Sequence, residues 1–311
     1  MPIRCAPGMT TSASAPPHTA CNLCNRAVPA EREAVWRKDG LDVVDCPACG
    51  LLFRRDLPSA AELAEIYAGE YFRRPEEGDA QGYLDYIGDE DLHRLAARKR
   101  LRRLARHALP GRLLDVGAAA GFFVDEARRR GWQAEGIDVS TQMSAFGRDR
   151  LGLELATGVF ERSDYQSGAY DCVTMWDYIE HAIDPAAAFR SAHRVLRPDG
   201  IVALSTGDVG SLLARISGER WHLLTPRHHN FYFSGDTMRR YLEENAFEVL
   251  YIGHPSSPYS LRYCVHKLRT AAPRSGSLRR LSDWVAERRI GDLPIPANLW
   301  DVMTVVARKA G

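Results

Sequence analysis

The stretch "LLDVGAAAGFFVDEARRRGWQAEGIDVS" (113–140) restricts the fold more than any other part of the chain. An apolar strand ends at Asp115, a turn of small residues leads into a helix, and a second apolar strand ends at Asp138. This order is typical of a βαβ unit, in which a crossover helix joins two parallel strands. Because ligands of open α/β sheets bind at the carboxyl ends of the strands, the turn Gly117–Gly121 is a candidate ligand-binding loop.

The spacing of this turn distinguishes two classes of cofactor. A dinucleotide-binding turn has the spacing G-x-G-x-x-G, and its third glycine allows the helix to pack closely on the strand. The third position here is Phe122, which is too large for that role, and the spacing instead matches G-x-G-x-G with Ala119 in the middle. Asp138, at the end of the second strand, is placed to accept hydrogen bonds from both hydroxyls of a ribose.

The segment "YDCVTMWDYIEHAIDPAAAFRSAHRVLRPDGIVALST" extends the α/β alternation. It predicts a strand over Tyr170–Trp176, a helix over Pro185–Leu196 and, after a turn at Pro198–Gly200, a strand over Ile201–Ser205. Asp184 is the expected N-cap of the helix, since a side-chain oxygen there can accept hydrogen bonds from the first turn.

These segments, with "FSGDTMRRYLEENAFEV" further on, resemble the class I S-adenosylmethionine-dependent methyltransferases over about Arg112 to Lys309. The resemblance implies an α/β fold: a Rossmann-like seven-stranded sheet with helices on both faces, a small N-terminal zinc knuckle and a helical lid. More narrowly, the cysteine pairs and the terminal "LPIPANLWDVMTVVARK" resemble a bacterial subgroup of saccharide and natural-product methyltransferases. The implied activity is methyl transfer to a sugar, nucleotide-sugar, glycan or related natural product.

The resemblance also implies a set of residues around S-adenosylmethionine and its product S-adenosylhomocysteine. The expected cofactor-binding residues are Asp115, Gly117, Ala118, Ala119, Gly121, Phe122, Asp138, Val139, Gly158, Val159, Trp176 and Asp177. The chain departs from the family pattern at Ala118-Ala119-Ala120, where Cys-Gly-Thr is usual, but alanines are still small enough for the cofactor to approach. Asp115 as a partner of backbone amides only, and Trp176 as a core residue only, remain alternatives.

The stretch "TPRHHNFYFS" (225–234) supplies the expected acceptor side of the site. His229 corresponds to the family's pocket-facing histidine, so it is the candidate base or substrate-orienting group. His228 stands where an acidic partner is usual, and His181 follows the fourth strand. A metal site made of His228 and His229 together is not expected, because adjacent residues of an extended segment point to opposite sides. The predicted substrate contacts are Tyr71, Tyr83 and Tyr86 of the helical lid, and Trp221, Asn230 and Tyr232.

Four cysteines in two pairs predict a structural metal site near the N-terminus. Cys21 and Cys24 form one C-x-x-C pair, Cys46 and Cys49 form the other, and 21 residues separate the pairs. Two such pairs complete a tetrahedral shell of four thiolates, which is typical of structural zinc and leaves no open position. The residues between the pairs predict a short hairpin turning at Asp39-Gly40.

The same features suggest how the chain is divided. Residues 1–20, rich in Ala, Pro, Ser and Thr, are expected to be a disordered tail and not a signal peptide. The zinc module is expected over 21–56, a helical lid or linker over 57–110, and the methyltransferase domain over 111–311. Insertions at 207–233 and 255–298 are expected to shape the substrate site.

Composition limits the partners. The formal net charge of +1 gives no general attraction to nucleic acid, so no stable nucleic-acid partner is expected. No apolar run is long enough for a transmembrane helix, and a cytoplasmic location is expected. Arginines of the insertion at 255–298 are compatible with a phosphate-bearing small molecule. The alternatives are an RNA methyltransferase, since some carry a zinc ribbon, and a non-catalytic cofactor-binding protein. The oligomeric state and the acceptor atom stay open.

Overall fold

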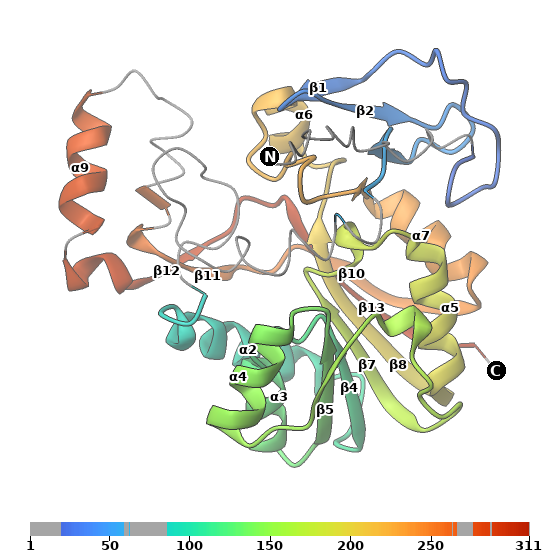
Figure 1. Cartoon of the computed structure of the whole chain (residues 1–311), viewed down its shortest axis with the longest axis vertical. Coiled ribbons are helices and arrows are strands. Elements are labelled where there is room, and N and C mark those ends of the chain that lie inside the picture. Colours follow the sequence, from blue (N-terminus) through green and yellow to red (C-terminus); the bar gives the residue numbers. More distant parts are fainter. Residues whose placement is uncertain are drawn as a thin grey trace, which may run out of the picture.

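The computed structural model describes residues 20–58, 62, 86–262, 264–265, 276–286 and 288–310. Its centre is a seven-stranded sheet with the order β10-β13-β8-β7-β4-β5-β6 (Figure 1). Neighbouring strands are parallel except β13, which is antiparallel to both β8 and β10. The strands are β4 (Arg112–Val116), β5 (Gln133–Asp138), β6 (Leu155–Thr157), β7 (Tyr170–Trp176), β8 (Leu196–Gly207), β10 (Phe247–Gly253) and β13 (Val302–Lys309). The predicted Rossmann-like seven-stranded sheet is confirmed.

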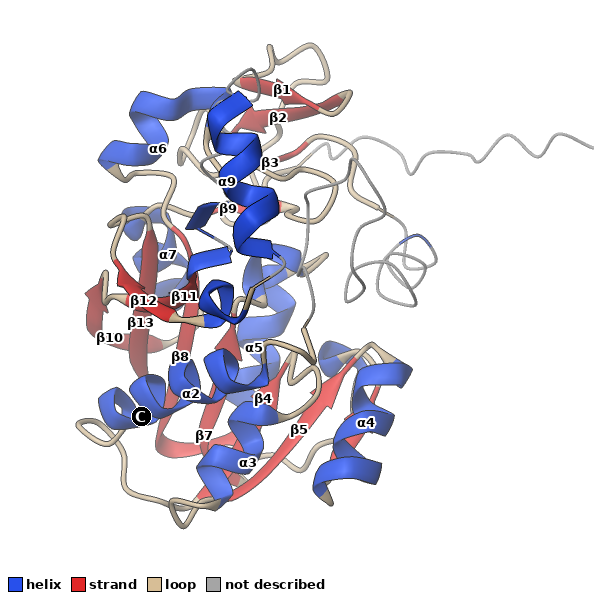
Figure 2. Ribbon diagram, turned by 90° about the vertical axis from the view of Figure 1, so that its left-hand side faces the viewer, coloured by secondary structure: helices blue, strands red, loops and turns tan. Residues whose placement is uncertain are grey.

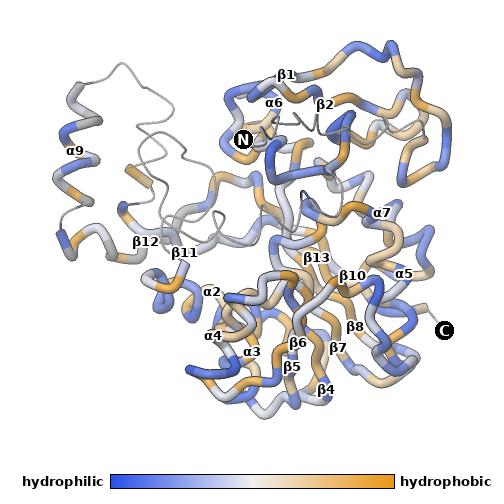
Figure 3. Tube along the Cα trace, in the orientation of Figure 1, coloured by the Kyte–Doolittle hydropathy of each residue, from blue (hydrophilic) through white to orange (hydrophobic). Residues whose placement is uncertain are grey.

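Helices cover both faces of this sheet, as predicted. On one face, α2 (Glu90–Leu104) and α3 (Phe122–Arg128) pack their buried residues against β4, β7 and β8. On the other face, α5 (Pro185–Val195) and α7 (Gly235–Glu244) pack against the same strands and β13 (Figure 2). The inner strands of the sheet are coloured toward the hydrophobic end of the scale in Figure 3. Strands that are buried on both faces need apolar side chains throughout, which explains the near-continuous apolar runs.

Local sequence signals explain several element boundaries. Pro185 begins α5, and the Asp184 side chain caps it by accepting a hydrogen bond from the Ala187 N–H, as expected from the sequence. Ser140 caps α4 (Thr141–Leu151) in the same way. Arg94 of α2 is buried, although it belongs to a basic run, and it forms ion pairs with Glu90 and Asp125.

A second sheet joins the N-terminal segment to the rest of the protein. The strands β1 (Trp36–Lys38) and β2 (Leu41–Asp45) form the predicted hairpin, and β3 (Leu52–Arg54) pairs with β2. The fourth strand of this sheet, β9 (Phe231–Tyr232), comes from the "TPRHHNFYFS" stretch and pairs with β3. The cysteine-bearing segment is therefore connected by main-chain hydrogen bonds to the loop that carries His228 and His229.

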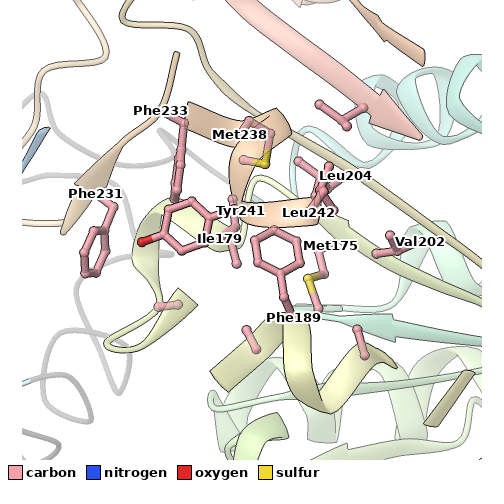
Figure 4. Close-up of a cluster of buried hydrophobic side chains, with 14 of the residues drawn as sticks. Met175, Ile179, Phe189, Val202, Leu204, Phe231, Phe233, Met238, Tyr241 and Leu242 are labelled. Atoms are coloured by element: carbon pink, nitrogen blue, oxygen red, sulfur yellow. The ribbon is translucent and has the colours of Figure 1, made fainter. Parts of the chain in front are cut away.

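Aromatic packing fixes the other side of this loop. Phe231 of β9 and Phe233 directly after it belong to one buried cluster with Phe189 of α5 and Tyr241 of α7 (Figure 4). The rings of Phe233 and Tyr241 meet edge to face with their centroids 5.6 Å apart. Phe231 and Phe233 are both almost fully buried, so they form part of the core wall behind this loop.

The remaining elements belong to neither of these two sheets. They are the short helices η2 (Phe160–Arg162), η3 (Ile179–His181), η4 (Gly218–Arg220) and η5 (Arg289–Asp292), the helices α6 (Leu212–Ser217) and α9 (Gly276–Ala286), and the paired strands β11 (Ser257–Ser260) and β12 (Pro294–Ala297). In Figure 1, α9 stands at the periphery, apart from the main sheet. Among the described helices, none is long and apolar enough to cross a membrane.

Candidate active site

A cavity of about 1130 Å³ opens at the carboxyl ends of the parallel strands. Its walls come from α2, from the loops after β4, β5, β6 and β7, and from the stretch that precedes β9. Residues 255–260, which lead into and form β11, close a further side. Pockets for one small ligand usually measure about 300–1,000 Å³, so this cavity can hold a cofactor together with a small second molecule.

The turn after β4 has the backbone that close approach of a ligand requires. Gly117, Ala119 and Gly121 all have positive φ, at 75°, 46° and 81°. A Cβ on Gly117 would lie 2.8 Å from a ring carbon of Tyr178, so only glycine fits there. Ala119 has this left-handed conformation without being glycine, and its N–H donates a hydrogen bond of 2.8 Å to Oδ2 of Asp138.

Two carboxyl groups lie beneath and beside this turn. Asp138 accepts a second hydrogen bond at Oδ1, from the Ser140 N–H, which fixes its carboxylate at the rim of the cavity. Burial raises the pKa of Asp138, and the two N–H donors oppose that shift. Asp115 is fully enclosed and accepts a hydrogen bond of 2.5 Å from the Thr174 hydroxyl. Its burial raises the pKa of Asp115 to about 7.

Most positions expected to bind the cofactor line this cavity. The lining includes Asp115, Gly117, Ala118, Ala119, Phe122, Asp138, Val139, Gly158, Val159, Trp176 and Asp177. Gly121 is absent from the described lining, and a Cβ there would meet Leu153 at 2.6 Å, so this glycine serves helix packing. The indole Nε1 of Trp176 is buried and has no hydrogen-bond partner among the described residues, although the residue lines the cavity.

Sequence reasoning missed Arg100 of α2, because the basic run around it has the pattern of a surface helix. Nη2 of Arg100 lies 2.6 Å from Oδ2 of Asp177 and 3.3 Å from the Ser205 hydroxyl. Its guanidinium carbon stands 4.8 Å from the centre of the Trp176 ring, in a cation–π contact. No local signal marks this arginine, since only the packing of α2 on the sheet brings it to the floor of the cavity.

At the opposite end, the structure brings two predicted histidines together with a glutamate. Glu180 and His181 belong to η3, directly after β7, and His229 precedes β9. The rings of His181 and His229 meet edge to face with centroids 4.8 Å apart. One potential ligand atom from each of the three residues lies within 4.8 Å of the other two. His228 also lines the cavity but is not part of this cluster.

Glu180 is buried and both histidines are half-buried, and this burial shifts the pKa values of Glu180 and His181. Burial, together with the negative charge of Asp177, raises the pKa of Glu180 to about 8. Burial, reinforced by His228, lowers the pKa of His181 to about 4. The Nδ1 atoms of His181 and His229 each lie 2.9 Å from a backbone carbonyl oxygen, those of His228 and Leu223.

The residues expected to contact substrate are distributed differently. Tyr86 lines the cavity and stacks on His93 with a centroid distance of 4.1 Å, whereas Tyr71 and Tyr83 lie outside the described residues. The described lining does not include Trp221, Asn230 or Tyr232. All three are buried outside this lining, so the cavity geometry gives them no direct contact with a substrate.

Trp221 and Asn230 form hydrogen bonds that stabilise the surrounding structure. Nε1 of Trp221 donates a hydrogen bond of 2.9 Å to Oδ2 of the buried Asp301. Asn230 connects the histidine loop to η3, because its N–H donates to the Glu180 carbonyl at 2.7 Å and its Nδ2 to the His181 carbonyl at 2.9 Å. Asn230 therefore positions the cluster from outside the cavity.

The four cysteines expected to bind zinc lie together in a separate place. Sγ of Cys21 is 3.5 Å from Sγ of Cys49, and Sγ of Cys24 is 3.6 Å from Sγ of Cys46. All four sulfurs lie within 4.8 Å of one another, and all four cysteines are free thiols. Sulfur atoms bonded in a disulfide would be about 2 Å apart. The spacing instead suits four thiolates around one tetrahedral ion.

Comparisons with known proteins agree with this geometry. The model of a methyltransferase-domain family matches residues 89–252. Ubiquinone biosynthesis O-methyltransferases are similar in part: that of Xanthomonas campestris pv. campestris is 36% identical over 33% of this chain and 46% of its own, and that of Sodalis glossinidius is 34% identical over 30% and 40%. The chain thus spans less than half the length of these curated relatives.

Solved structures share the fold at low sequence identity. Geranyl diphosphate C-methyltransferase from Streptomyces coelicolor A3(2), solved with Mg²⁺, geranyl diphosphate and S-adenosyl-L-homocysteine, has a TM-score of 0.50 and 16% identity over 81% of this chain and 100% of that one. A Haloferax volcanii methyltransferase in complex with the Trm112 methyltransferase activator has a TM-score of 0.51 and 16% identity over 72% of this chain and 92% of that one. Since the family match covers more than half of the 311 residues, the protein belongs to the methyltransferase-domain family, with the class I fold of S-adenosylmethionine-dependent methyltransferases.

Proposed function

We propose that the protein transfers a methyl group from S-adenosylmethionine to a small-molecule acceptor, a sugar, nucleotide-sugar, glycan or related natural product. The observation that carries this proposal is a single cavity of about 1130 Å³ with the glycine turn and Asp138 on one side and a half-buried histidine pair on the other. Both halves that a methyl transfer needs, a cofactor cradle and an acceptor-binding group, therefore face the same space.

The residues at the cofactor end fit an S-adenosyl group. The left-handed turn at Gly117 and Ala119 leaves its backbone open to the cavity, and the Asp138 carboxylate at the rim can accept hydrogen bonds from ribose hydroxyls. When bound, S-adenosylmethionine supplies a methyl group already activated by its sulfonium sulfur, which leaves with the electron pair of the broken carbon–sulfur bond.

The protein's part is then to orient the acceptor and to remove its proton. A carbonyl oxygen can only accept a hydrogen bond, so Nδ1 of His229 must donate to the Leu223 carbonyl, and in the neutral ring Nε2 carries the lone pair. This nitrogen can take the proton of an acceptor hydroxyl as the oxygen lone pair forms the new bond to the methyl carbon. Positioning accounts for much of the expected acceleration.

Charges around the cavity favour a small acceptor over RNA. Arg94 is buried in ion pairs, and Arg98 pairs with Glu126 at 2.9 Å, so part of the basic run is already neutralised within the fold. Arg102, Arg103 and Arg106 line the cavity, where a phosphate-bearing acceptor would find cations. An RNA methyltransferase would need a broad exposed basic surface, since phosphate contacts dominate nucleic-acid affinity.

We further propose that the four clustered cysteines hold a structural zinc ion. Their sulfur spacing of 3.5 and 3.6 Å supports a tetrahedral four-thiolate shell, which has no open position for catalysis. Because β3 pairs with β9, an ion at this place would also stabilise the loop that carries His229.

Calorimetric titration with S-adenosylhomocysteine, followed by a methyl-transfer assay on cell metabolite extracts, tests the proposed function. We expect saturable cofactor binding that Asp138→Ala weakens, and methyl incorporation into a small polar product that resists RNase. Absence of cofactor binding would overturn the methyltransferase proposal. Incorporation that RNase removes would instead favour the RNA alternative.

A further inference from the structure

The cluster of Glu180, His181 and His229 has the composition of a metal site. Two imidazoles and one carboxylate form the protein ligand set of many catalytic zinc and non-haem iron sites, which keep open positions for water or substrate. The three potential ligand atoms converge to within 4.8 Å of one another. The residues come from two chain segments, so their convergence is a property of the tertiary fold.

The hydrogen bonds that hold the two histidine rings are also those of a metal site. Metal-bound histidines usually donate their other ring nitrogen to a carbonyl or carboxylate, which fixes the ring and its tautomer. Here Nδ1 of His181 lies 2.9 Å from the His228 carbonyl oxygen, and Nδ1 of His229 lies 2.9 Å from the Leu223 carbonyl oxygen. Both rings are therefore fixed with Nε2 as the lone-pair nitrogen, the form that coordinates a cation.

The carboxylate of the cluster provides an independent observation. Glu180 is only 5% exposed, and its Oε2 is buried without a hydrogen-bond partner in the described part of the chain. A buried carboxylate oxygen with no partner is costly unless a cation compensates it. Asn230 holds this residue in place, since its N–H donates to the Glu180 carbonyl at 2.7 Å.

We propose that Glu180, His181 and His229 bind one divalent transition-metal ion, with Zn²⁺ as the reference ion, at the acceptor end of the cavity. The mixed nitrogen and oxygen ligands favour Zn²⁺ and its neighbours in the first transition row over Mg²⁺. The His228 ring is not a ligand, and only its backbone carbonyl takes part, as the partner of His181 Nδ1. The proposed site therefore differs from a metal site made of the adjacent residues His228 and His229, which the sequence does not predict.

The role of such an ion rests on the proposed function. An open position on the ion that faces the cavity would bind the acceptor hydroxyl and lower its pKa, which is a general effect of zinc on a bound oxygen. His229 would then hold the metal and would not take up the proton, which would pass to solvent. Metal binding itself can be measured without cofactor or acceptor, so the two proposals can fail separately.

Metal content after equilibration with Zn²⁺ and removal of excess ion tests the site. We expect two equivalents for the wild type: one in the four-cysteine shell, lost in Cys46→Ser, and one in the cluster, lost in His181→Ala, His229→Ala and Glu180→Gln. The matched control is His228→Ala, which should retain two. One equivalent in the wild type, or two in folded His229→Ala, would overturn the proposal.

Cobalt substitution tests the ligand set by its absorption spectrum, in addition to the metal content. Co²⁺ bound by four thiolates has intense sulfur-to-metal charge-transfer absorption, whereas Co²⁺ bound by nitrogen and oxygen has only weak ligand-field bands. In Cys46→Ser we expect only the weak ligand-field bands of Co²⁺ bound by nitrogen and oxygen. The amide of Glu180→Gln keeps the shape of the carboxylate but not its charge. Because one charged ligand is lost, this variant should bind Co²⁺ at least tenfold more weakly. Unchanged Co²⁺ affinity in folded Glu180→Gln would contradict the assignment.

Discussion

The guanidinium of Arg100 forms an ion pair of 2.6 Å with Asp177 and lies over the ring of Trp176. This contact connects α2 to the last residue of β7 and to Asp177 directly after it, both of which line the cavity. It places a fixed positive charge between two side chains that the family resemblance assigns to the cofactor. Arg100 is consequently expected to hold both in their cofactor-binding positions.

We expect Arg100→Ala to weaken S-adenosylhomocysteine binding roughly five- to tenfold, about 1 kcal/mol, because Asp177 loses its partner and Trp176 its covering cation. Calorimetric titration measures the change. Arg98→Ala is the matched control, since Arg98 is on the same helix, pairs with Glu126 and is outside the described cavity lining. Equal affinity in the wild type and Arg100→Ala would exclude this positioning role.

His229→Ala should lower turnover by about a hundredfold or more, in the range of a lost general base or a lost metal ligand. Cofactor affinity should stay within about twofold of the wild type, because the histidine lies at the acceptor end. Single-turnover methyl transfer and calorimetry separate the two quantities. Wild-type turnover in this variant would reduce the histidine to a packing residue.

Ala119→Gly should stabilise the fold by about 0.5 to 1 kcal/mol. The left-handed conformation costs alanine about 1–2 kcal/mol, and the added flexibility of glycine offsets part of the gain. Gly117→Ala should instead destabilise the fold by about 1–3 kcal/mol, because its Cβ would lie 2.8 Å from Tyr178 and its φ is 75°. Denaturant unfolding measures both, and a loss of stability in Ala119→Gly would contradict the backbone argument.

The buried Asp115 predicts a dependence of stability on pH. Its pKa is raised from 3.8 to about 7 in the folded protein, so between these values the folded state holds a proton that the unfolded state has released. Stability from this residue is therefore fully present below about pH 4 and is lost as the pH rises toward 7.

We accordingly expect the free energy of unfolding of the wild type to fall by about 2–3 kcal/mol more than that of Asp115→Asn between pH 5 and pH 8. Asparagine keeps an oxygen for the Thr174 hydroxyl but does not titrate. Urea unfolding at the two pH values checks this. Parallel profiles of the two proteins would show that Asp115 does not titrate in this interval.

Loss of the proposed structural zinc should destabilise both the cysteine-bearing segment and β9, which is paired with it. In Cys46→Ser we expect one fewer zinc equivalent and a destabilisation of several kcal/mol, because binding energy of a structural ion is folding energy. Since β3 pairs with β9, hydrogen exchange should also rise at Phe231 and Tyr232. Cys264→Ser, at an isolated cysteine, is the control, and an unchanged melting temperature in Cys46→Ser would argue against a structural ion.

Much of the main sheet could be predicted from the sequence because its signals are local. The apolar runs of β4 and β7, the Asp184 cap and the small residues of the Gly117–Gly121 turn each act within a few residues of their own position. The sequence also predicts that the glycine turn and Asp138 lie side by side at the carboxyl ends of the strands. The βαβ order alone brings the ends of β4 and β5 together.

Contacts between distant segments were decided only by the tertiary structure. Arg100 has the same local pattern as its surface neighbours, and only the packing of α2 directs it to Asp177. Likewise, His229 meets Glu180 and His181 because β9 completes the N-terminal sheet and Asn230 connects it to η3. The sequence by itself determined the sheet and the glycine turn, whose causes are short-range patterns of size and polarity. The acceptor end depended on long-range pairing, which no single stretch of sequence encodes.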